Sequence, residues 1–183
     1  MIRFALWLLG GILLGGVVHL GSVLALPRTA TQDAYSRLAP ITPVNTAAAL
    51  PVPSPDQAVL PFMDPAFAVA VCRYDLSEAP LKLTTPVGQA YTSVSFYTRH
   101  GVANSAINDR AAGRRVIELE LMTAAQRSQV PEDEEVTAAD RLIVASPTLT
   151  GLVVLRALSP EPSSMPVARG VLAAARCQPS PQT

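Results

Sequence analysis

An uninterrupted apolar run opens the hydropathy pattern of the chain. Residues 4–26 carry no formal charge, and His19 is their only titratable side chain. About 20 apolar residues, each rising 1.5 Å along a helix, cross the roughly 30 Å hydrocarbon core of a bilayer. Pro27 follows this run directly, so the pattern predicts a transmembrane helix that ends there, within an anchor segment of residues 1–26.

The charges beside this run set its expected orientation. Arg3 and the α-amino group precede it and only Arg28 follows closely, which by the positive-inside rule favours a cytoplasmic N-terminus. We therefore expect a single-pass inner-membrane protein that contacts membrane lipid through residues 4–26 and places its C-terminal domain in the periplasm. A signal peptide cleaved after the small residues near Ala25 is the alternative. The run is longer than the roughly 7–15 residues of a signal h-region, which favours an uncleaved signal anchor.

Small residues mark one face of the predicted membrane helix. Gly11 and Gly15 stand four residues apart, and His19 continues the same face. Small side chains let a second helix approach closely, so this face predicts a helix–helix contact with a protein partner in the membrane. A haem ligand or proton relay at His19 is the alternative, because intramembrane ionisable groups are often functional. His19 is only seven residues from the end of the run, where a neutral imidazole is tolerated.

Proline dominates the segment that follows the anchor. Eight of the 17 prolines lie within residues 27–65. Because proline fixes φ and lacks an N–H, the segment excludes a long helix or a central strand. We predict a Pro-rich linker over residues 27–63 that is mostly extended, with room for one helical turn at residues 33–38. Phe62 and Met63, at its end, are expected to pack on the next domain.

From Ala66 onwards, short alternating or uncharged runs are typical of strands. The expected strands cover residues 66–74, 81–84, 91–97, 105–108, 115–122, 141–145 and 152–157. Thr123 and Gln126 form a capping-box pattern for a short helix. Ser163 or Ser164 is expected to cap a last helix that has Pro166 in its first turn and is completed by residues 168–176.

These elements predict a mostly β (α+β) fold. We expect an antiparallel β-sandwich-like domain of residues 64–177 that ends in a C-terminal helix, followed by a disordered tail of residues 178–183.

The two cysteines stand near the two ends of this domain. Cys72 lies in the first predicted strand and Cys177 at the end of the last helix. In an oxidising compartment this placement predicts a disulfide, which would close a loop of about 100 residues and stabilise the fold by roughly 4–5 kcal/mol in the chain-entropy model. Two buried thiols, or a redox pair, are the alternatives, although the spacing is unlike C-x-x-C.

Composition narrows the classes of function. Fourteen basic residues balance fourteen acidic ones, which gives no general attraction to nucleic acid. Only 15% of the residues are charged, which excludes a highly charged disordered protein. A four-ligand His/Cys zinc site would need both histidines and both cysteines, so we expect neither a metal nor another cofactor.

The search for catalytic groups predicts none. The chain has no nucleophile elbow, P-loop, dinucleotide fingerprint or zinc-protease motif. His100 is the only histidine outside the apolar run, and its position after a strand suggests a loop residue. Glu118 and Glu120 share one face of a predicted strand, where a solvent-facing edge is a simpler explanation than paired acid and base.

One stretch resembles a known bacterial family. Residues 72–83, from Cys72-Arg73-Tyr74-Asp75-Leu76 to Leu83, lead through Pro86 to the aromatic strand 91–97. This order resembles the N-terminal part of the domain of unknown function 1254, in particular its short membrane-anchored members, over about residues 64–122. Ala79 stands where that family usually has glycine. The resemblance implies a β-rich exported domain and supplies no catalytic residues.

The same stretch supplies candidate ligand-binding positions. These positions are Asp64, Tyr74, Asp75, Tyr91 and Tyr97. Structural roles, in a tight turn and in a buried hydroxyl network, would explain these residues equally well.

Two functions are compatible with this organisation. The first is a non-catalytic, membrane-anchored protein of the cell envelope that binds a partner or serves as an accessory subunit of a membrane complex. The alternative is an extracytoplasmic small-ligand binder or hydrolase. That alternative requires a pocket, which we expect between the sheet and the last helix.

Overall fold

The first unit of the chain is a single helix. The computed structural model describes residues 1–29, 33–54, 58–112, 115–129 and 142–180, and it divides into units 1–33 and 34–183. Helix α1 spans Ile2–Thr29, and its stretch Ile2–Leu26 is apolar and long enough to cross a membrane by length and composition. The predicted end at Pro27 is wrong by two residues. A proline disturbs the bond to the carbonyl four residues earlier, which here affects only the last turn.

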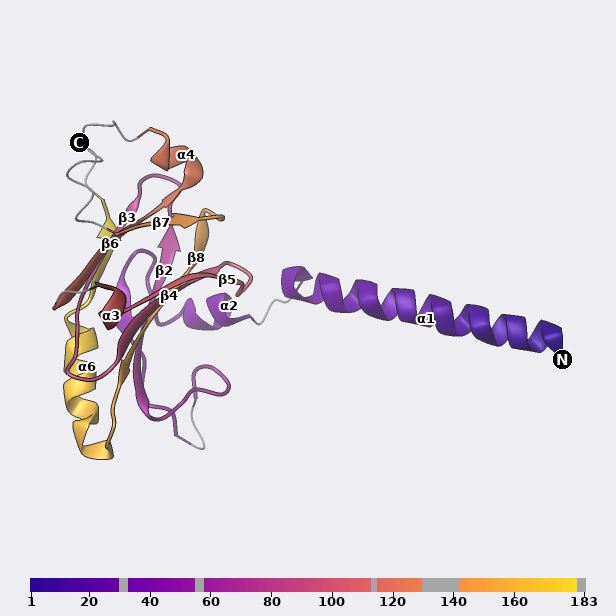
Figure 1. The fold of residues 1–183 in the computed structure, drawn as a ribbon, viewed down its shortest axis with the longest axis horizontal. Coiled ribbons are helices and arrows are strands. Elements are labelled where there is room, and N and C mark those ends of the chain that lie inside the picture. Colours follow the sequence, from indigo (N-terminus) through magenta and orange to yellow (C-terminus); the bar gives the residue numbers. More distant parts are fainter. Residues whose placement is uncertain (30–32, 55–57, 113–114, 130–141, 181–183) are drawn as a thin grey trace. The chain divides into compact units, whose positions relative to one another are not determined.

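The second unit is built on two β-sheets, which confirms the mostly β, α+β fold class (Figure 1). The five-stranded sheet has the order β1 (Ala47–Ala49), β2 (Phe67–Asp75), β8 (Thr150–Leu158), β4 (Thr92–Thr98) and β5 (Ala103–Asn108). The four-stranded sheet has the order β7 (Leu142–Ser146), β6 (Val116–Thr123), β3 (Leu81–Pro86) and β9 (Arg176–Pro179).

Alternation along the strands places one face of each in the main core. In β6, Ile117, Leu119 and Leu121 are completely buried, as the period-two pattern predicts. They pack in one hydrophobic cluster with inward-facing side chains of the other sheet, such as Val94 and Phe96 of β4. The sandwich core therefore follows directly from the binary pattern of the strands.

One pairing departs from the antiparallel prediction. Strands β6 and β7 are parallel, with Leu119 opposite Leu142 and Thr123 opposite Ser146. A parallel pair needs a crossover of about a dozen residues or more, and the stretch between Thr123 and Leu142 is long enough. The length of that connection, rather than any pattern in the strands, allows the parallel direction.

The segment predicted as a Pro-rich linker is largely part of the folded unit, which begins at Ala34 and not at Asp64. Helix α2 (Ala34–Leu38) and edge strand β1 lie within it. Leu38 and Leu50 are buried and form a second cluster with Val71 and Leu152, on the face of the five-stranded sheet opposite the main core. Prolines are compatible with sheet edges and with turns, so a proline-rich segment still covers a sheet face.

The end of this segment corrects another expectation. Met63 packs against the second cluster, but Phe62 does not pack on the domain, because its side chain is fully exposed. Phe62 also has a positive φ of 59°, which is rare for a bulky residue and turns the side chain outwards at this bend.

The C-terminal helix is shorter than predicted, and a strand follows it. After a 3₁₀ turn, η1 (Pro162–Ser164), helix α6 spans Met165–Ala173. The chain then forms β9, so Cys177 lies in a strand and residues 178–179 are not part of a tail. Strand β3 has a free edge that accepts β9, which no local pattern at residues 174–179 reveals.

The predicted disulfide is confirmed. Cys72 of β2 is bonded to Cys177 of β9 and so joins the two sheets, with a sequence separation of 105 residues. The described residues also form the short helices α3 (Asp109–Ala112) and α4 (Ala124–Arg127), and α4 begins with the predicted capping box of Thr123 and Gln126.

Candidate functional site

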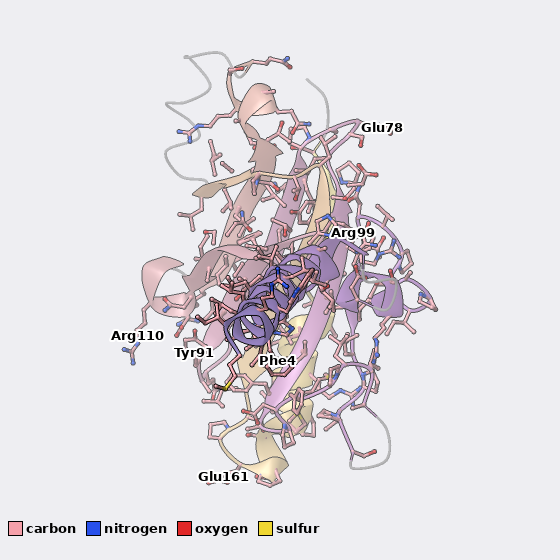
Figure 2. The ribbon with its side chains drawn as sticks, turned by 90° about the vertical axis from the view of Figure 1, so that its right-hand side faces the viewer. Phe4, Glu78, Tyr91, Arg99, Arg110 and Glu161 are labelled. Atoms are coloured by element: carbon pink, nitrogen blue, oxygen red, sulfur yellow. A yellow bond between two sulfur atoms is a disulfide. The ribbon has the colours of Figure 1, made fainter. Side chains whose placement is uncertain are left out.

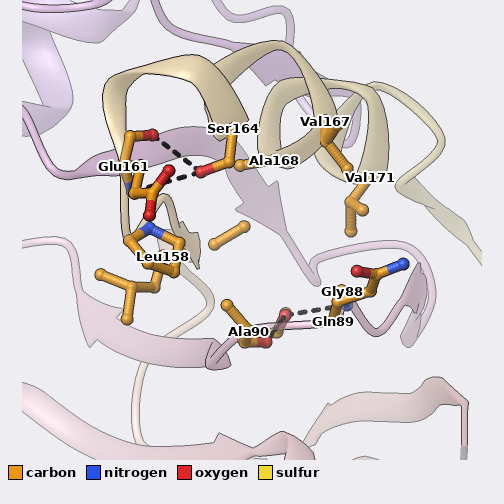
Figure 3. Close-up of a pocket in the computed structure, with 12 residues that line it drawn as sticks. Gly88, Gln89, Ala90, Leu158, Glu161, Ser164, Val167, Ala168 and Val171 are labelled. Atoms are coloured by element: carbon orange, nitrogen blue, oxygen red, sulfur yellow. Dashed lines mark hydrogen bonds between the residues drawn. The ribbon is translucent and has the colours of Figure 1, made fainter.

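A pocket of about 360 Å³ opens between α6 and the adjoining ends of β4 and β8 in the five-stranded sheet (Figure 3). Glu161 is one of the residues that line the pocket. Figure 2 shows it at the end of the sandwich opposite to Glu78. The loop before β4 contributes Gly88, Gln89 and Ala90, β4 contributes Thr92, and β8 contributes Ala157 and Leu158. The turn before α6 contributes Pro160, Glu161 and Ser164, and α6 contributes Val167, Ala168 and Val171.

The turn before α6 is held by serine hydroxyls. Ser159 is buried and donates to the Glu161 carbonyl at 2.7 Å, and Ser164 donates to the same carbonyl at 2.8 Å. The two hydroxyl oxygens are themselves 2.8 Å apart. Pro162 stands in the first turn, where its missing N–H costs nothing. This local chemistry fixes the start of α6 and therefore one wall of the pocket.

The opposite wall is held by Thr92, which is completely buried. Its hydroxyl accepts a hydrogen bond from the Gly88 N–H at 3.1 Å and donates to the Ala90 carbonyl at 3.5 Å. A Cβ at Gly88 would lie 3.7 Å from Val171, so the loop approaches α6 closely here. These contacts shape the loop of residues 88–90 around the pocket.

The remaining lining is mostly aliphatic. Ala90, Ala157, Ala168 and Val171 face the cavity, and Val167 is 61% exposed at its mouth. Within the described part of the lining, Glu161 has the only ionisable side chain. A concave, aliphatic surface with few polar groups is suited to binding a small apolar group.

Tyr74 is a structural residue at a distance from this pocket. Its side chain is completely buried, and its hydroxyl lies 3.2 Å from the Tyr97 carbonyl, 3.0 Å from Ser146 Oγ and 3.5 Å from Thr148 Oγ1. The ring lies over Gly151, which pairs with Tyr74 across β2 and β8. This hydroxyl network binds β2, β4 and the β7–β8 turn together.

Asp75 forms the turn after β2. Its carboxylate accepts from the Ser77 hydroxyl at 2.6 Å and from the Ser77 N–H at 2.9 Å. These two hydrogen bonds hold the pKa of the Asp75 carboxyl below its usual value of 3.8, against a smaller opposing effect of desolvation. The Asn45 amide also pairs with the Asp75 backbone in both directions. Asp75 therefore fixes the direction of the chain in this turn.

The other three candidates do not converge either. Asp64 accepts from the Ala66 N–H at 2.9 Å, in another turn. The ring of Tyr97 packs in the second hydrophobic cluster. Tyr91 is 42% exposed beside the pocket residues Ala90 and Thr92, without being part of the lining. The structure thus brings Tyr74 and Tyr97 together in one network and leaves the five positions without a shared cavity.

Two arginine side chains stack on the ring of Tyr35 in the second unit, an arrangement that is not apparent from the sequence. The guanidinium carbons of Arg73 and Arg99 lie 4.4 and 4.3 Å from the ring centre of Tyr35. Arg73 also donates to the Thr42 carbonyl at 3.3 Å, and Arg99 donates to Ser36 Oγ at 3.3 Å. These contacts fasten α2 to the sheet. Their sequence separation explains why no motif reveals them.

Within α1, the predicted contact face is open. A Cβ built at Gly11 or Gly15 meets nothing within 4 Å, and the apolar side chains of the span are exposed.

In the part of the chain that the structure describes, no group of three or more His, Cys, Asp or Glu side chains could hold a metal ion.

The comparisons identify the family but no activity. The family model described as "Protein of unknown function (DUF1254)" matches residues 44–179. No curated protein matches the chain.

Two solved structures share the fold. The VPA0106 protein from Vibrio parahaemolyticus has a TM-score of 0.58 and 13% identity, over 82% of this chain and 38% of that one. An uncharacterised protein from Burkholderia cenocepacia has a TM-score of 0.50 and 15% identity, over 88% of this chain and 49% of that one. This chain thus spans less than half of either neighbour's length. Because the family model covers most of its residues, the chain belongs to the DUF1254 family of proteins of unknown function.

Proposed function

We propose that this protein is a membrane-anchored binding module of the cell envelope, whose β-sandwich holds a small apolar ligand outside the cytoplasm. The observation that carries this proposal is the pocket of about 360 Å³ between α6 and the sheet. Its volume falls within the roughly 300–1,000 Å³ typical of small-molecule sites, and its walls are mostly aliphatic.

The anchor and the disulfide support the compartment. Helix α1 is a single N-terminal apolar helix compatible with a signal anchor. The Cys72–Cys177 disulfide suits an oxidising compartment, where such bonds persist. A cytoplasmic N-terminus and a periplasmic sandwich satisfy both features. Alkaline phosphatase fused to the C-terminus should then be active. Green fluorescent protein fused there should not fluoresce, because it would be exported through the general secretion route. The reverse result rejects this orientation.

The chemistry of the lining supports binding without catalysis. The two hydroxyls at the pocket, Thr92 and Ser164, each bond to a backbone carbonyl. A nucleophilic hydroxyl needs an adjacent base to activate it, and the described lining residues include no histidine or lysine. The Glu161 carboxylate accepts from the Ser163 hydroxyl at 3.4 Å, and its capping-box contact with Ser164 is to the backbone N–H and not to the hydroxyl.

Binding of an apolar fluorescent probe tests the proposal. The full chain is reconstituted in phosphatidylcholine nanodiscs and titrated with N-phenyl-1-naphthylamine, with empty nanodiscs as the blank. We expect saturable binding of one probe per chain. Ala90→Leu narrows the pocket and should abolish this binding. Ala173→Leu makes the same change at an exposed α6 position outside the lining and should preserve it. No saturable signal above empty nanodiscs, or equal loss in both variants, rejects the proposal.

A second function, an accessory subunit of a membrane complex, rests on the open small-residue face of α1. Gly11 and Gly15, with His19, would contact a partner helix. Gly11→Leu/Gly15→Leu should remove a co-purified membrane partner, whereas Gly10→Leu/Gly21→Leu, on a different face, should retain it. If both pairs of substitutions leave the same companions bound, this face makes no such contact.

A further inference from the structure

The polar groups of the α6 pocket fall into two classes. The Thr92 and Ser164 hydroxyls are engaged within the protein, each with a donor or hydroxyl partner and a backbone carbonyl. A hydroxyl in this state has its donor used and adds little selectivity for a ligand. Ligand selection therefore depends on the two other polar side chains of the lining, Glu161 and Gln89.

Glu161 gives the pocket its sign of charge. It is the only ionisable residue among the lining residues that the structure describes, and it stands in the turn that leads into α6 (Figure 3). Its carboxylate accepts a long hydrogen bond from the Ser163 hydroxyl at 3.4 Å and forms a capping box with the Ser164 backbone N–H, which leaves further acceptor capacity on its two oxygens. A carboxylate at a partly apolar site attracts a cationic group and repels an anionic one.

The rest of the lining indicates the shape of the ligand. The described lining residues include no aromatic side chain, so they offer no ring on which a sugar or a base would stack. Its walls are formed by alanine, valine and leucine side chains from α6, β8 and the loop before β4. Such walls suit an alkyl group, for which burial from water supplies the affinity.

We infer that the α6 pocket binds an aliphatic ligand with a cationic head, with the alkyl part against Ala90, Ala168 and Val171 and the head facing Glu161. This inference rests on the proposed function and names the ligand class of the same site. A primary alkylamine is the simplest member of this class.

Competition among three ligands with the same chain tests the charge preference. Hexylamine, hexanol and hexanoate are used at pH 7 to displace N-phenyl-1-naphthylamine from the full chain in zwitterionic nanodiscs. Hexylamine carries a positive charge at this pH, and we expect it to displace the probe at a concentration roughly threefold below that of hexanol, in keeping with an ion pair at a partly exposed carboxylate. Hexanoate should be the weakest competitor.

Variants separate the head group from the pocket. Glu161→Gln should make hexylamine and hexanol equal while leaving the binding of the neutral probe unchanged. Glu120→Gln removes one carboxylate from β6, in the other sheet, and should preserve the hexylamine preference. If hexanoate competes as well as hexylamine, or if Glu161→Gln leaves the preference intact, the inference is wrong although the pocket still binds the probe. Absence of probe binding would instead refute the proposed function.

Discussion

Replacing Gly151 with alanine is expected to destabilise the sandwich strongly. Gly151 of β8 lies opposite Tyr74 of β2 and Thr98 of β4. A Cβ at this position would overlap the Tyr97 carbonyl oxygen and the Tyr74 hydroxyl, and it would lie 2.5 Å from Tyr74 Cζ. The two Tyr74 atoms belong to a completely buried side chain, and the Tyr97 oxygen belongs to the backbone of β4, so none of these atoms moves easily.

The magnitude follows from two effects. Overpacking a filled core typically costs about 1–3 kcal/mol. Moving the Tyr74 ring also weakens its hydroxyl contacts with the Tyr97 carbonyl and Ser146 Oγ, and a buried polar group without its partner costs about 1–3 kcal/mol. Together they lower the free energy of unfolding by about 2–6 kcal/mol. For a folded unit of this size, each kcal/mol corresponds to roughly 2–4 °C, so the melting temperature should fall by at least about 4 °C.

Thermal unfolding of the full chain in detergent micelles measures this change. Circular dichroism at a strand wavelength reports the sandwich, and the disulfide is kept oxidised. Gly170→Ala is the matched control, because a Cβ there meets nothing within 4 Å and the residue lies exposed in α6. Removing this helical glycine should stabilise the protein by about 0.5–1 kcal/mol. A Gly151→Ala variant as stable as the wild type would refute the packing argument.

Three further predictions concern other parts of the second unit. Reducing the disulfide between Cys72 and Cys177, which are 105 residues apart in the sequence, should lower the free energy of unfolding by about 4–5 kcal/mol, and an unchanged melting temperature with and without reductant would contradict this. Tyr35→Ala should lower stability by about 1–2 kcal/mol through loss of two guanidinium contacts, beyond its lost packing, whereas Tyr35→Phe retains a ring and should be close to wild type in chemical denaturation. Because Ser77 lowers the folded-state pKa of Asp75, this carboxylate stabilises the fold at pH values above its unfolded value, 3.8, and the contribution is lost as the pH falls through the lower folded value. Asp75→Asn should therefore flatten the acid limb of the stability profile, and an identical acid limb in both proteins would exclude this contribution.

Most strands could be predicted because burial alternates along them. The strand at residues 116–123 is an example: its inward residues Ile117, Leu119 and Leu121 follow from the period-two pattern of the sequence alone. The capping box of Thr123 and Gln126 is equally local, since both partners lie within four residues. Such features depend on neighbours in the chain, which the sequence shows directly.

The missed elements depend on partners distant in sequence. β1 has three alanines and forms only because it pairs with β2, and β9 exists because β3 has a free edge. The burial of Leu38 against Val71 and Leu152 likewise requires residues more than 30 positions away. Proline content correctly excludes long regular elements in this segment, but it does not determine whether the segment packs on a sheet.

The candidate site shows the same division. The family resemblance makes Asp64 and Asp75 candidate ligand-binding positions, and the structure explains both through turns. A pocket is expected between the sheet and the last helix, and a pocket lies there. Its lining residues could not be predicted, because Thr92 and Ser164 have no signature distinguishing them from other hydroxyl residues.

Hydropathy and side-chain period act over a few consecutive residues, so the sequence is enough to specify the apolar helix, the alternating strands and the pair of cysteines. The tertiary fold alone settles which strands adjoin, that Tyr74 lies on Gly151, and that residues 88–92 meet α6 around a cavity. These arrangements come from burying apolar surface that is shared between distant segments. The energy that selects them belongs to the assembled sheets and to no single stretch of chain.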